Sequence, residues 1–297
     1  MSARTERAQP LQSTSPSPSE LEAFQADGFL RVPAAFARAD AELMQAEWWA
    51  ELAEVHGVNR EDRSTWRQQR GDLKRPKTAP SQRLIETARV GGVIDALLGQ
   101  GAWDWPRDWG RAIVTFPSGA PAEAWDVPTR LWHWDGPTAW NRQRLTTLFV
   151  VAFVGEVRPA GGGTLVLAGS PRLVLDQYEA RPPAQRGVGE TWWRDRLHRS
   201  HPWLAALTGC AASPNDRIGA FMRDGGEVDG ARLRVVELTG QPGDMVFCHP
   251  LLLHVVAPNC GEVPRFMRIK QQLMSHEAQR LLEGEIEKSR RRKEARP

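Results

Sequence analysis

The stretch from residue 145 to residue 154 constrains the fold most strongly. It reads LTTLFVVAFV and is apolar almost throughout, without a charged residue. A continuous apolar run of this length, in place of polar–apolar alternation, is expected of a strand buried on both faces. The chain must therefore place other structure on either side of this strand.

Further strands and helices are predicted around it. Helical spacing of apolar residues predicts helices over 39–56 and 81–98, the second ended by Gly99 and Gly101, and Ser19 is the expected N-cap of a short helix that ends near residue 26. Six more segments have the composition and bounding turns of strands: 29–32, 111–116, 164–168, 232–238, 245–248 and 265–272. We expect a mainly β protein with flanking helices, of the α+β class.

The chain is expected to form one domain. Residues 1–18 are rich in Ser, Pro, Thr and Gln and are predicted to be a disordered tail, and 276–297 is predicted to be a charged C-terminal helix or tail. The domain then covers 19–275. Helical patterns within 172–230 indicate an insertion, which we expect to act as a lid over one mouth of the β structure.

Composition excludes several functional classes. The net charge is only +3, the three cysteines have no zinc-like or disulfide spacing, and no P-loop, GxGxxG or zinc-finger motif occurs. The sequence contains no run of about 18 apolar residues that would predict a membrane span, and no apolar leader that would predict secretion. We expect a soluble, cytoplasmic protein with a small-molecule substrate and without nucleic-acid or membrane partners. The sequence leaves the oligomeric state open.

One motif has the pattern of a metal site. The segment LWHWDGP (131–137) ends a predicted strand, so His133 and Asp135 lie on one face, roughly 6.5 Å apart along the strand. Trp132 and Trp134 then point the other way. A third ligand, His254, ends the segment GDMVFCHPLLLH (243–254), and two His with one carboxylate form the facial triad of non-heme Fe(II) oxygenases.

His249 is the rival of His254 within that segment. It lies five residues earlier, so on an extended chain its side chain faces the opposite side. We therefore assign it a structural or supporting role. The third metal ligand predicted from the sequence is His254.

These motifs, in this order, resemble the phytanoyl-CoA dioxygenase family. The resemblance rests on His-x-Asp at 133–135, the segment 243–254, Asn259 and Arg265, and extends to DGFLRVP (27–33) and GTLVLAGS (163–170). It implies an Fe(II)- and 2-oxoglutarate-dependent oxygenase on a double-stranded β-helix, a jelly-roll or cupin-like core.

The resemblance also implies residue roles. His133, Asp135 and His254 would be the iron ligands and catalytic residues. Arg265 would bind the distal carboxylate of 2-oxoglutarate, because a guanidinium matches a carboxylate with two parallel hydrogen bonds. Strand parity puts Arg265 on an apolar inward face and Arg268 on the opposite face, toward solvent or a helix.

Two positions depart from the family pattern. Val256 stands where many members carry a hydroxyl residue that helps hold the co-substrate, and Thr147 is the replacement suggested by the sequence. Pro171 stands where a His or a similar residue is usual, in a loop near the site. Asn259 is expected to cap the turn after His254, and the flanking Trp140 is expected to pack or to line the pocket.

The implied reaction is hydroxylation of a C–H bond with O2, releasing succinate and CO2, with ascorbate expected to stimulate turnover. The related halogenases lack a carboxylate ligand, so Asp135 favours hydroxylation. Two alternatives stay open: a zinc-dependent hydrolase that uses the same three residues, and a non-catalytic β-barrel binding module. The sequence does not define the substrate.

Overall fold

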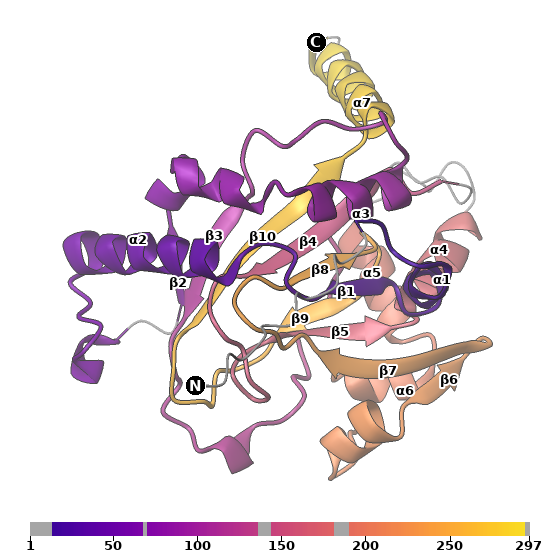
Figure 1. Cartoon of the computed structure of the whole chain (residues 1–297). Helices are drawn as coiled ribbons and strands as arrows, with labels where there is room; N and C mark the ends of the chain where they lie inside the picture. Colours follow the sequence, from indigo (N-terminus) through magenta and orange to yellow (C-terminus); the bar gives the residue numbers. More distant parts are fainter. Residues whose placement is uncertain (1–13, 68–69, 136–143, 181–189, 295–297) are drawn as a thin grey trace, which may run out of the picture.

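Two antiparallel sheets carry the fold in the computed structural model, which describes residues 14–67, 70–135, 144–180 and 190–294 (Figure 1). The larger sheet has six strands in the order β1 (Phe29–Val32), β8 (Met245–Cys248), β4 (Thr147–Phe153), β10 (Arg265–Met274), β3 (Arg111–Thr115) and β2 (Arg70–Leu73). The smaller sheet has four, in the order β6 (Gly226–Val228), β7 (Ala231–Glu237), β5 (Thr164–Ala168) and β9 (His254–Val256).

Strand β4 lies at the centre of the core. All seven of its residues are buried, as predicted for the apolar run. Phe149 and Val151 point into the layer between the sheets, where they share an apolar cluster with Val166 of β5. Leu148 and Val150 point the other way, into the cluster beneath the helices. The strand is thus covered on both faces because each sheet face has its own partner layer.

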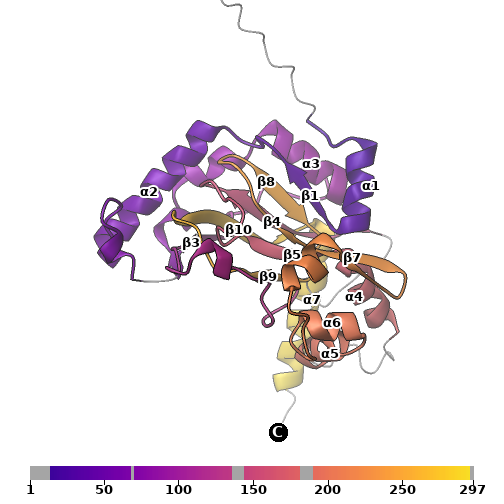
Figure 2. The same ribbon diagram turned by 90° about the horizontal axis from the view of Figure 1, so that it is seen from below.

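Helices cover the outer face of the six-stranded sheet. They are α1 (Pro18–Asp27), α2 (Arg38–His56) and α3 (Ala88–Leu98), and Figure 2 shows α2 and α3 on one side of the sheets with α5 and α6 on the other. Trp48 of α2 is fully buried in this layer beside Phe266 of β10. The predicted helix over 39–56 is confirmed.

Two predicted helix starts are wrong. The expected helix over 81–98 is divided into a 3₁₀ segment (Pro80–Ile85) and α3. Thr87 causes the break: its hydroxyl donates to Ala35 O (2.7 Å) and accepts from Val90 N–H (3.2 Å), which makes it the N-cap of a new helix. At α1 the N-cap is Ser17 and not Ser19, because Ser17 and Glu20 form a capping box.

The predicted insertion packs on the outer face of the four-stranded sheet. Its described elements are α4 (Ser170–Glu179), α5 (Glu190–His198), α6 (Pro202–Leu207), a π-helix (Gly219–Arg223) and β6. Their buried leucines share one cluster with outward residues of β5, β7 and β9. These helices are therefore part of the core and not the expected lid, since the outer sheet face needs an apolar cover.

The remaining elements are peripheral. Short 3₁₀ segments lie at Arg63–Thr65, Arg75–Lys77 and Ala122–Ala124, and α7 (His276–Glu294) extends away from the end of β10, as Figure 1 shows. The predicted disordered tail 1–18 lies mostly outside the described residues, and α1 already begins within it. Across the described part of the chain, no helix is both long and apolar enough to cross a membrane.

Candidate metal centre

His133 and His254 are brought together by a pair of backbone hydrogen bonds. His133 N–H donates to His254 O (3.0 Å), and His254 N–H donates to His133 O (2.7 Å). This isolated antiparallel bridge extends the smaller sheet, because His254 is the first residue of β9 and pairs with Val166 of β5 on its other side. Two distant parts of the sequence thus present their side chains next to each other.

Both imidazole rings are oriented by backbone carbonyl groups. His133 Nδ1 lies 2.7 Å from Leu131 O, and His254 Nδ1 lies 2.9 Å from Leu252 O. A carbonyl oxygen only accepts, so each neutral ring carries its proton on Nδ1 and leaves the Nε2 lone pair free. This is the arrangement by which proteins fix the tautomer of a metal-ligating histidine.

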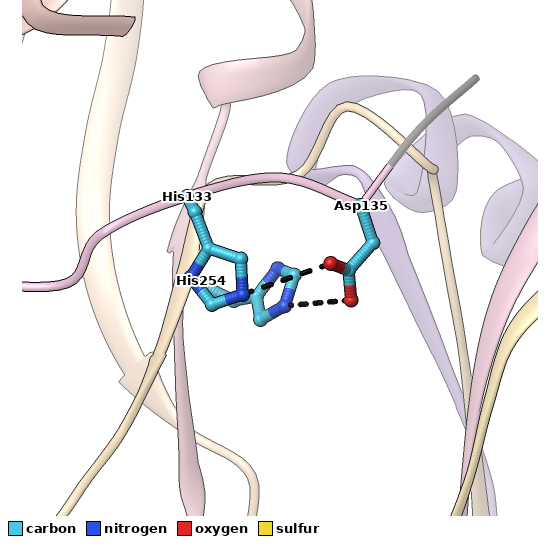
Figure 3. Close-up of side chains that lie close together, drawn as sticks. All are labelled: His133, Asp135 and His254. Atoms are coloured by element: carbon cyan, nitrogen blue, oxygen red, sulfur yellow. Dashed lines mark ion pairs between the residues drawn. The ribbon is translucent and has the colours of Figure 1, made fainter. Parts of the chain in front are cut away.

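Asp135 completes a three-residue cluster. Its Oδ1 lies 3.7 Å from His133 Nε2 and its Oδ2 lies 3.4 Å from His254 Nε2 (Figure 3). All the donor atoms lie within 4.8 Å of one another. Ligand atoms bound at about 2.0–2.2 Å to one ion stand about 3 to 4 Å apart, so a divalent cation fits between these tips with small adjustments. The predicted ligands are brought together, although 131–135 forms a single bridge at His133 and not the predicted strand end.

The protonation states also suit a metal. Burial raises the pKa of Asp135, but the adjacent His254 ring and a hydrogen bond from Gln271 lower it to about 2, so the carboxylate is ionised at neutral pH. Burial, the largest cause, lowers the pKa of His133, so its ring is neutral at neutral pH. Neutral imidazole and ionised carboxylate are the forms that bind metal ions.

Two glutamines of β10 donate hydrogen bonds to Asp135, one to its carboxylate and one to its backbone. Gln271 Nε2 donates to Asp135 Oδ2 (3.0 Å), and Gln272 Nε2 donates to the backbone carbonyl of Asp135 (3.3 Å). The register of β10 against β4 shifts between Lys270 and Leu273, and this irregularity lets two consecutive residues reach the same segment. The sequence analysis missed both glutamines.

Aromatic residues flank the centre. Phe149 of β4 stacks on the His254 ring, with centroids 4.8 Å apart and planes at 15°. Trp132 and Trp134 point away from the ligands into the outer cluster of the smaller sheet, where Trp132 Nε1 donates to Pro128 O (2.8 Å). Trp140 lies outside the described residues.

Arg265 is buried on the inward face of β10, with 1% of its surface exposed. Its Nη2 donates to the Thr115 hydroxyl (2.7 Å), and its Nη1 contacts Gly162 O. Arg268 lies on the opposite face, over the Trp48 ring at 5.3 Å, as strand parity predicts. A guanidinium held between two strands at the inner layer is suited to receive a carboxylate.

The structure does not bring Thr147 to Arg265. Thr147 pairs with Met274, at the far end of β10 from Arg265. Thr115 is the residue whose hydroxyl meets the guanidinium. The sequence could not show this, because it does not reveal that β3 is the neighbour of β10.

Thr164 is a second hydroxyl that the sequence analysis missed. It pairs directly with Val256 across β5 and β9, two residues after the Gly162 carbonyl that contacts Arg265. The Thr164 side chain is 2% exposed, and among the described residues its hydroxyl has no hydrogen-bond partner. It shares the inward face with Val166. A hydroxyl is therefore present beside Val256, on the neighbouring strand.

Asn259 shapes the turn after β9. Its Nδ2 donates to Thr115 O (3.0 Å) and Val263 O (2.9 Å), and its Oδ1 accepts from Gly261 N–H (3.0 Å). These contacts agree with the capping role predicted for it, and they attach the turn to β3. Pro171 lies in the first turn of α4 and packs closely against Gly28, away from the three ligands.

Comparisons with known proteins bear on the fold. No family model and no curated protein matches the chain, so membership of the phytanoyl-CoA dioxygenase family is not shown. Among solved structures, the chain is similar to the non-heme α-ketoglutarate-dependent carbocyclase SnoK from nogalamycin biosynthesis, with a TM-score of 0.52, 15% identity, and coverage of 88% of this chain and 85% of that chain. At this identity the likeness shows a shared fold.

Two more distant similarities accompany it. EctD from S. alaskensis with bound Fe has a TM-score of 0.47 and 16% identity, covering 89% of this chain and 79% of that one. HygX from Streptomyces hygroscopicus with nickel and 2-oxoglutarate bound has a TM-score of 0.45 and 13% identity, covering 86% of each chain. The fold assignment rests on the carbocyclase.

Proposed function

We propose that this protein is an Fe(II)- and 2-oxoglutarate-dependent oxygenase that hydroxylates a C–H bond of a small organic molecule. The observation that supports this most directly is the orientation of the two imidazoles. Their Nε2 atoms lie 3.7 and 3.4 Å from the oxygens of Asp135, while each Nδ1 is held by a carbonyl. Two histidines and one carboxylate leave one face of an Fe(II) ion open for co-substrate and O2.

In this proposal the two sheets are the layers of a double-stranded β-helix, and His133, Asp135 and His254 hold the iron. Bound iron, with 2-oxoglutarate and O2, supplies the oxidising power for C–H hydroxylation, and succinate and CO2 are released. The chain itself supplies geometry: Gln271 holds the carboxylate in place, and Phe149 covers one face of the His254 ring.

Arg265, Thr115 and Thr164 form the proposed site for the far carboxylate of 2-oxoglutarate. The guanidinium is buried, one hydroxyl already meets it, and a second buried hydroxyl lies nearby on β5. A guanidinium and hydroxyl groups are hydrogen-bond donors that match the oxygens of a carboxylate.

The proposed carboxylate site favours the oxygenase over the zinc hydrolase that uses the same ligands. Hydrolysis needs a metal-bound water but no co-substrate, so Arg265 would then serve only through its contacts with Thr115 and Gly162. The resemblance to the phytanoyl-CoA dioxygenase family and a cytoplasmic location remain part of the proposal, together with the lack of nucleic-acid or membrane partners.

Succinate formation tests the proposal. Purified protein is incubated with Fe(II), ascorbate, O2 and 2-oxoglutarate, with and without a panel of candidate substrates. We expect succinate from the wild type, none from His133→Ala, and unchanged production from His276→Ala, which removes a half-exposed histidine bonded to Asp104. Ascorbate should increase the yield. A Zn(II)-loaded protein that makes no succinate under any of these conditions would contradict the proposal.

A further inference from the structure

A cavity of about 620 Å³ lies between α1, α3, α4 and the first residues of β4. This volume is within the range of about 300 to 1,000 Å³ that sites for small organic molecules occupy. Polar and apolar surface line it in similar amounts, and six of its apolar wall residues are Leu21, Phe24, Leu97, Leu145, Leu175 and Leu251. None of the three metal ligands is part of this wall.

The cavity adjoins the end of the β structure that holds the metal ligands. Thr147, in the cavity wall, precedes Phe149 by two residues on the same face of β4. Phe149 stacks on His254 and pairs with Cys248, the residue before His249, which also lines the cavity. The cavity wall is therefore two residues along β4 from the ring that stacks on His254.

His249 offers the cavity a hydrogen-bond donor. Its Nδ1 accepts from Leu251 N–H (3.1 Å), so the neutral ring carries its proton on Nε2. Burial lowers the pKa of His249 to about 4, which keeps the ring neutral at physiological pH. The Nε2–H group is then the donor that this ring can offer to a ligand.

Thr147 borders the cavity but does not offer it a hydrogen bond. The residue is 1% exposed, and its hydroxyl oxygen is enclosed, without a hydrogen-bond partner within the described ranges of the chain. A ligand in the cavity would therefore meet Thr147 by packing, and the polar contact would come from His249.

The charged residues around the cavity favour a ligand with a hydrogen-bond acceptor over a ligand with a positive charge. Two guanidiniums, Arg144 and Arg172, and one carboxylate, Asp176, are part of the wall. Asp176 lies 3.8 Å from Arg172, and Arg144 lies 3.8 Å from Glu277, which is not a wall residue. Among the described wall residues, the one carboxylate that an ammonium group could meet lies next to a guanidinium.

We propose that this cavity binds the body of the substrate, an amphipathic organic molecule with an apolar part and a carbonyl or carboxylate oxygen that accepts a hydrogen bond from His249 Nε2–H. The reacting carbon would then extend past Thr147 toward the metal centre. The link to a reaction rests on the proposed oxygenase function, whereas the binding itself does not.

Calorimetry with metal-free, full-length protein tests the binding. Three probes share one chain length and differ in head group: octanoate, octanol and octylammonium. We expect octanoate and octanol to bind, octanoate more tightly, and octylammonium not to bind. His249→Phe should weaken octanoate binding by about tenfold, the effect of one lost hydrogen bond.

Two matched pairs control for folding. Ala96→Trp places a large side chain on the α3 wall of the cavity and should abolish binding, whereas Ala53→Trp, on the exposed surface of α2, should not change it. His198→Phe replaces another buried neutral histidine, away from the cavity wall, and should leave binding intact. Thermal unfolding of each variant verifies that it is folded.

Three results would overturn the proposal: no probe binds, octylammonium binds as tightly as octanoate, or folded Ala96→Trp binds like the wild type. The outcomes also separate the two proposals. Octanoate binding that depends on His249, without any succinate formation, would uphold the cavity and reject the oxygenase. Succinate formation without probe binding would do the reverse.

Discussion

Val256 and Thr164 pair across β9 and β5, with both side chains on the inward face of the smaller sheet. The buried Thr164 hydroxyl thus lies beside Val256, the position at which this sequence lacks the hydroxyl of the family pattern. In the proposed function it binds the far carboxylate of 2-oxoglutarate together with Arg265. This relationship can be tested by moving the hydroxyl between the two strands.

Thr164→Val should raise the KM for 2-oxoglutarate by about tenfold, because one hydrogen bond to a charged group is lost. The double variant Thr164→Val/Val256→Thr restores a hydroxyl on the paired residue and should recover most of the loss. Steady-state succinate formation measures both. Thr78→Val, at an exposed threonine, is the control. An unchanged KM in Thr164→Val would remove this residue from the co-substrate site.

Gln271→Leu should weaken metal binding. The variant removes the hydrogen bond to Asp135 Oδ2 but no ligand, and such supporting contacts typically contribute about 10- to 100-fold in metal affinity. Competition with a chelator for Co(II) gives the affinity without activity. Gln279→Leu, at an exposed residue of α7, should bind Co(II) like the wild type. Equal affinities for the wild type and Gln271→Leu would show that the glutamine does not position the carboxylate.

Arg217 stabilises the segment that leads to His133. It is 6% exposed and donates to Val127 O (3.0 Å) and Leu207 O (2.8 Å), which ties that segment to the end of α6. Arg217→Met should lower the free energy of unfolding by about 2 to 4 kcal/mol, since buried carbonyls lose their donors. Urea titration of the two proteins measures this difference in the free energy of unfolding.

The control for Arg217 is Arg38→Met. Arg38 forms an exposed ion pair with Glu42 (2.9 Å), and such pairs contribute less than about 1 kcal/mol. Similar losses of stability in the two variants would contradict the role assigned to Arg217.

The titration of His198 should make the folded protein less stable at pH 5 than at neutral pH. Burial, and then the charge of Arg194, lower its pKa to about 4 in the folded state, against 6.5 for an ordinary histidine. Above pH 6.5 both states are neutral. Between pH 6.5 and 4 only the unfolded state binds the proton, so the free energy of unfolding falls as pH decreases, by about 2 kcal/mol at pH 5.

Denaturant titrations at pH 7.5 and pH 5 measure this effect. His198→Phe should show a smaller difference between the two pH values than the wild type, because one titrating group is gone. The exposed His56 is suited to a control, since His56→Phe should keep the wild-type difference. An equal pH dependence in His198→Phe and wild type would refute the assignment.

Much of the site could be predicted from the sequence because the positions of these residues follow from local patterns. Strand parity placed Arg265 and Arg268 on opposite faces, and the i, i+2 relation placed His133 and Asp135 together. The residues that were missed depend on which strands become neighbours. Thr115 contacts Arg265 because β3 pairs with β10. Thr164 lies near Arg265 because the turn before β5 contacts the guanidinium through Gly162. No local sequence pattern encodes either pairing.

The same reason explains the other differences. Gln271 reaches Asp135 because β10 is irregular at that point, and a bulge cannot be read from apolar periodicity. The helices of the insertion have apolar faces that fit a lid or a core equally well. They pack as core because the apolar outer face of the smaller sheet would be exposed without them.

Anaerobic spectroscopy tests the central claim most directly. Fe(II)-loaded protein is titrated with 2-oxoglutarate in the absence of O2, and the visible spectrum is recorded for wild type, His133→Ala and His276→Ala. We predict a weak charge-transfer band that saturates with 2-oxoglutarate in the wild type and His276→Ala and is absent in His133→Ala. Wild-type protein that binds Fe(II) but develops no band at saturating 2-oxoglutarate would contradict the oxygenase assignment.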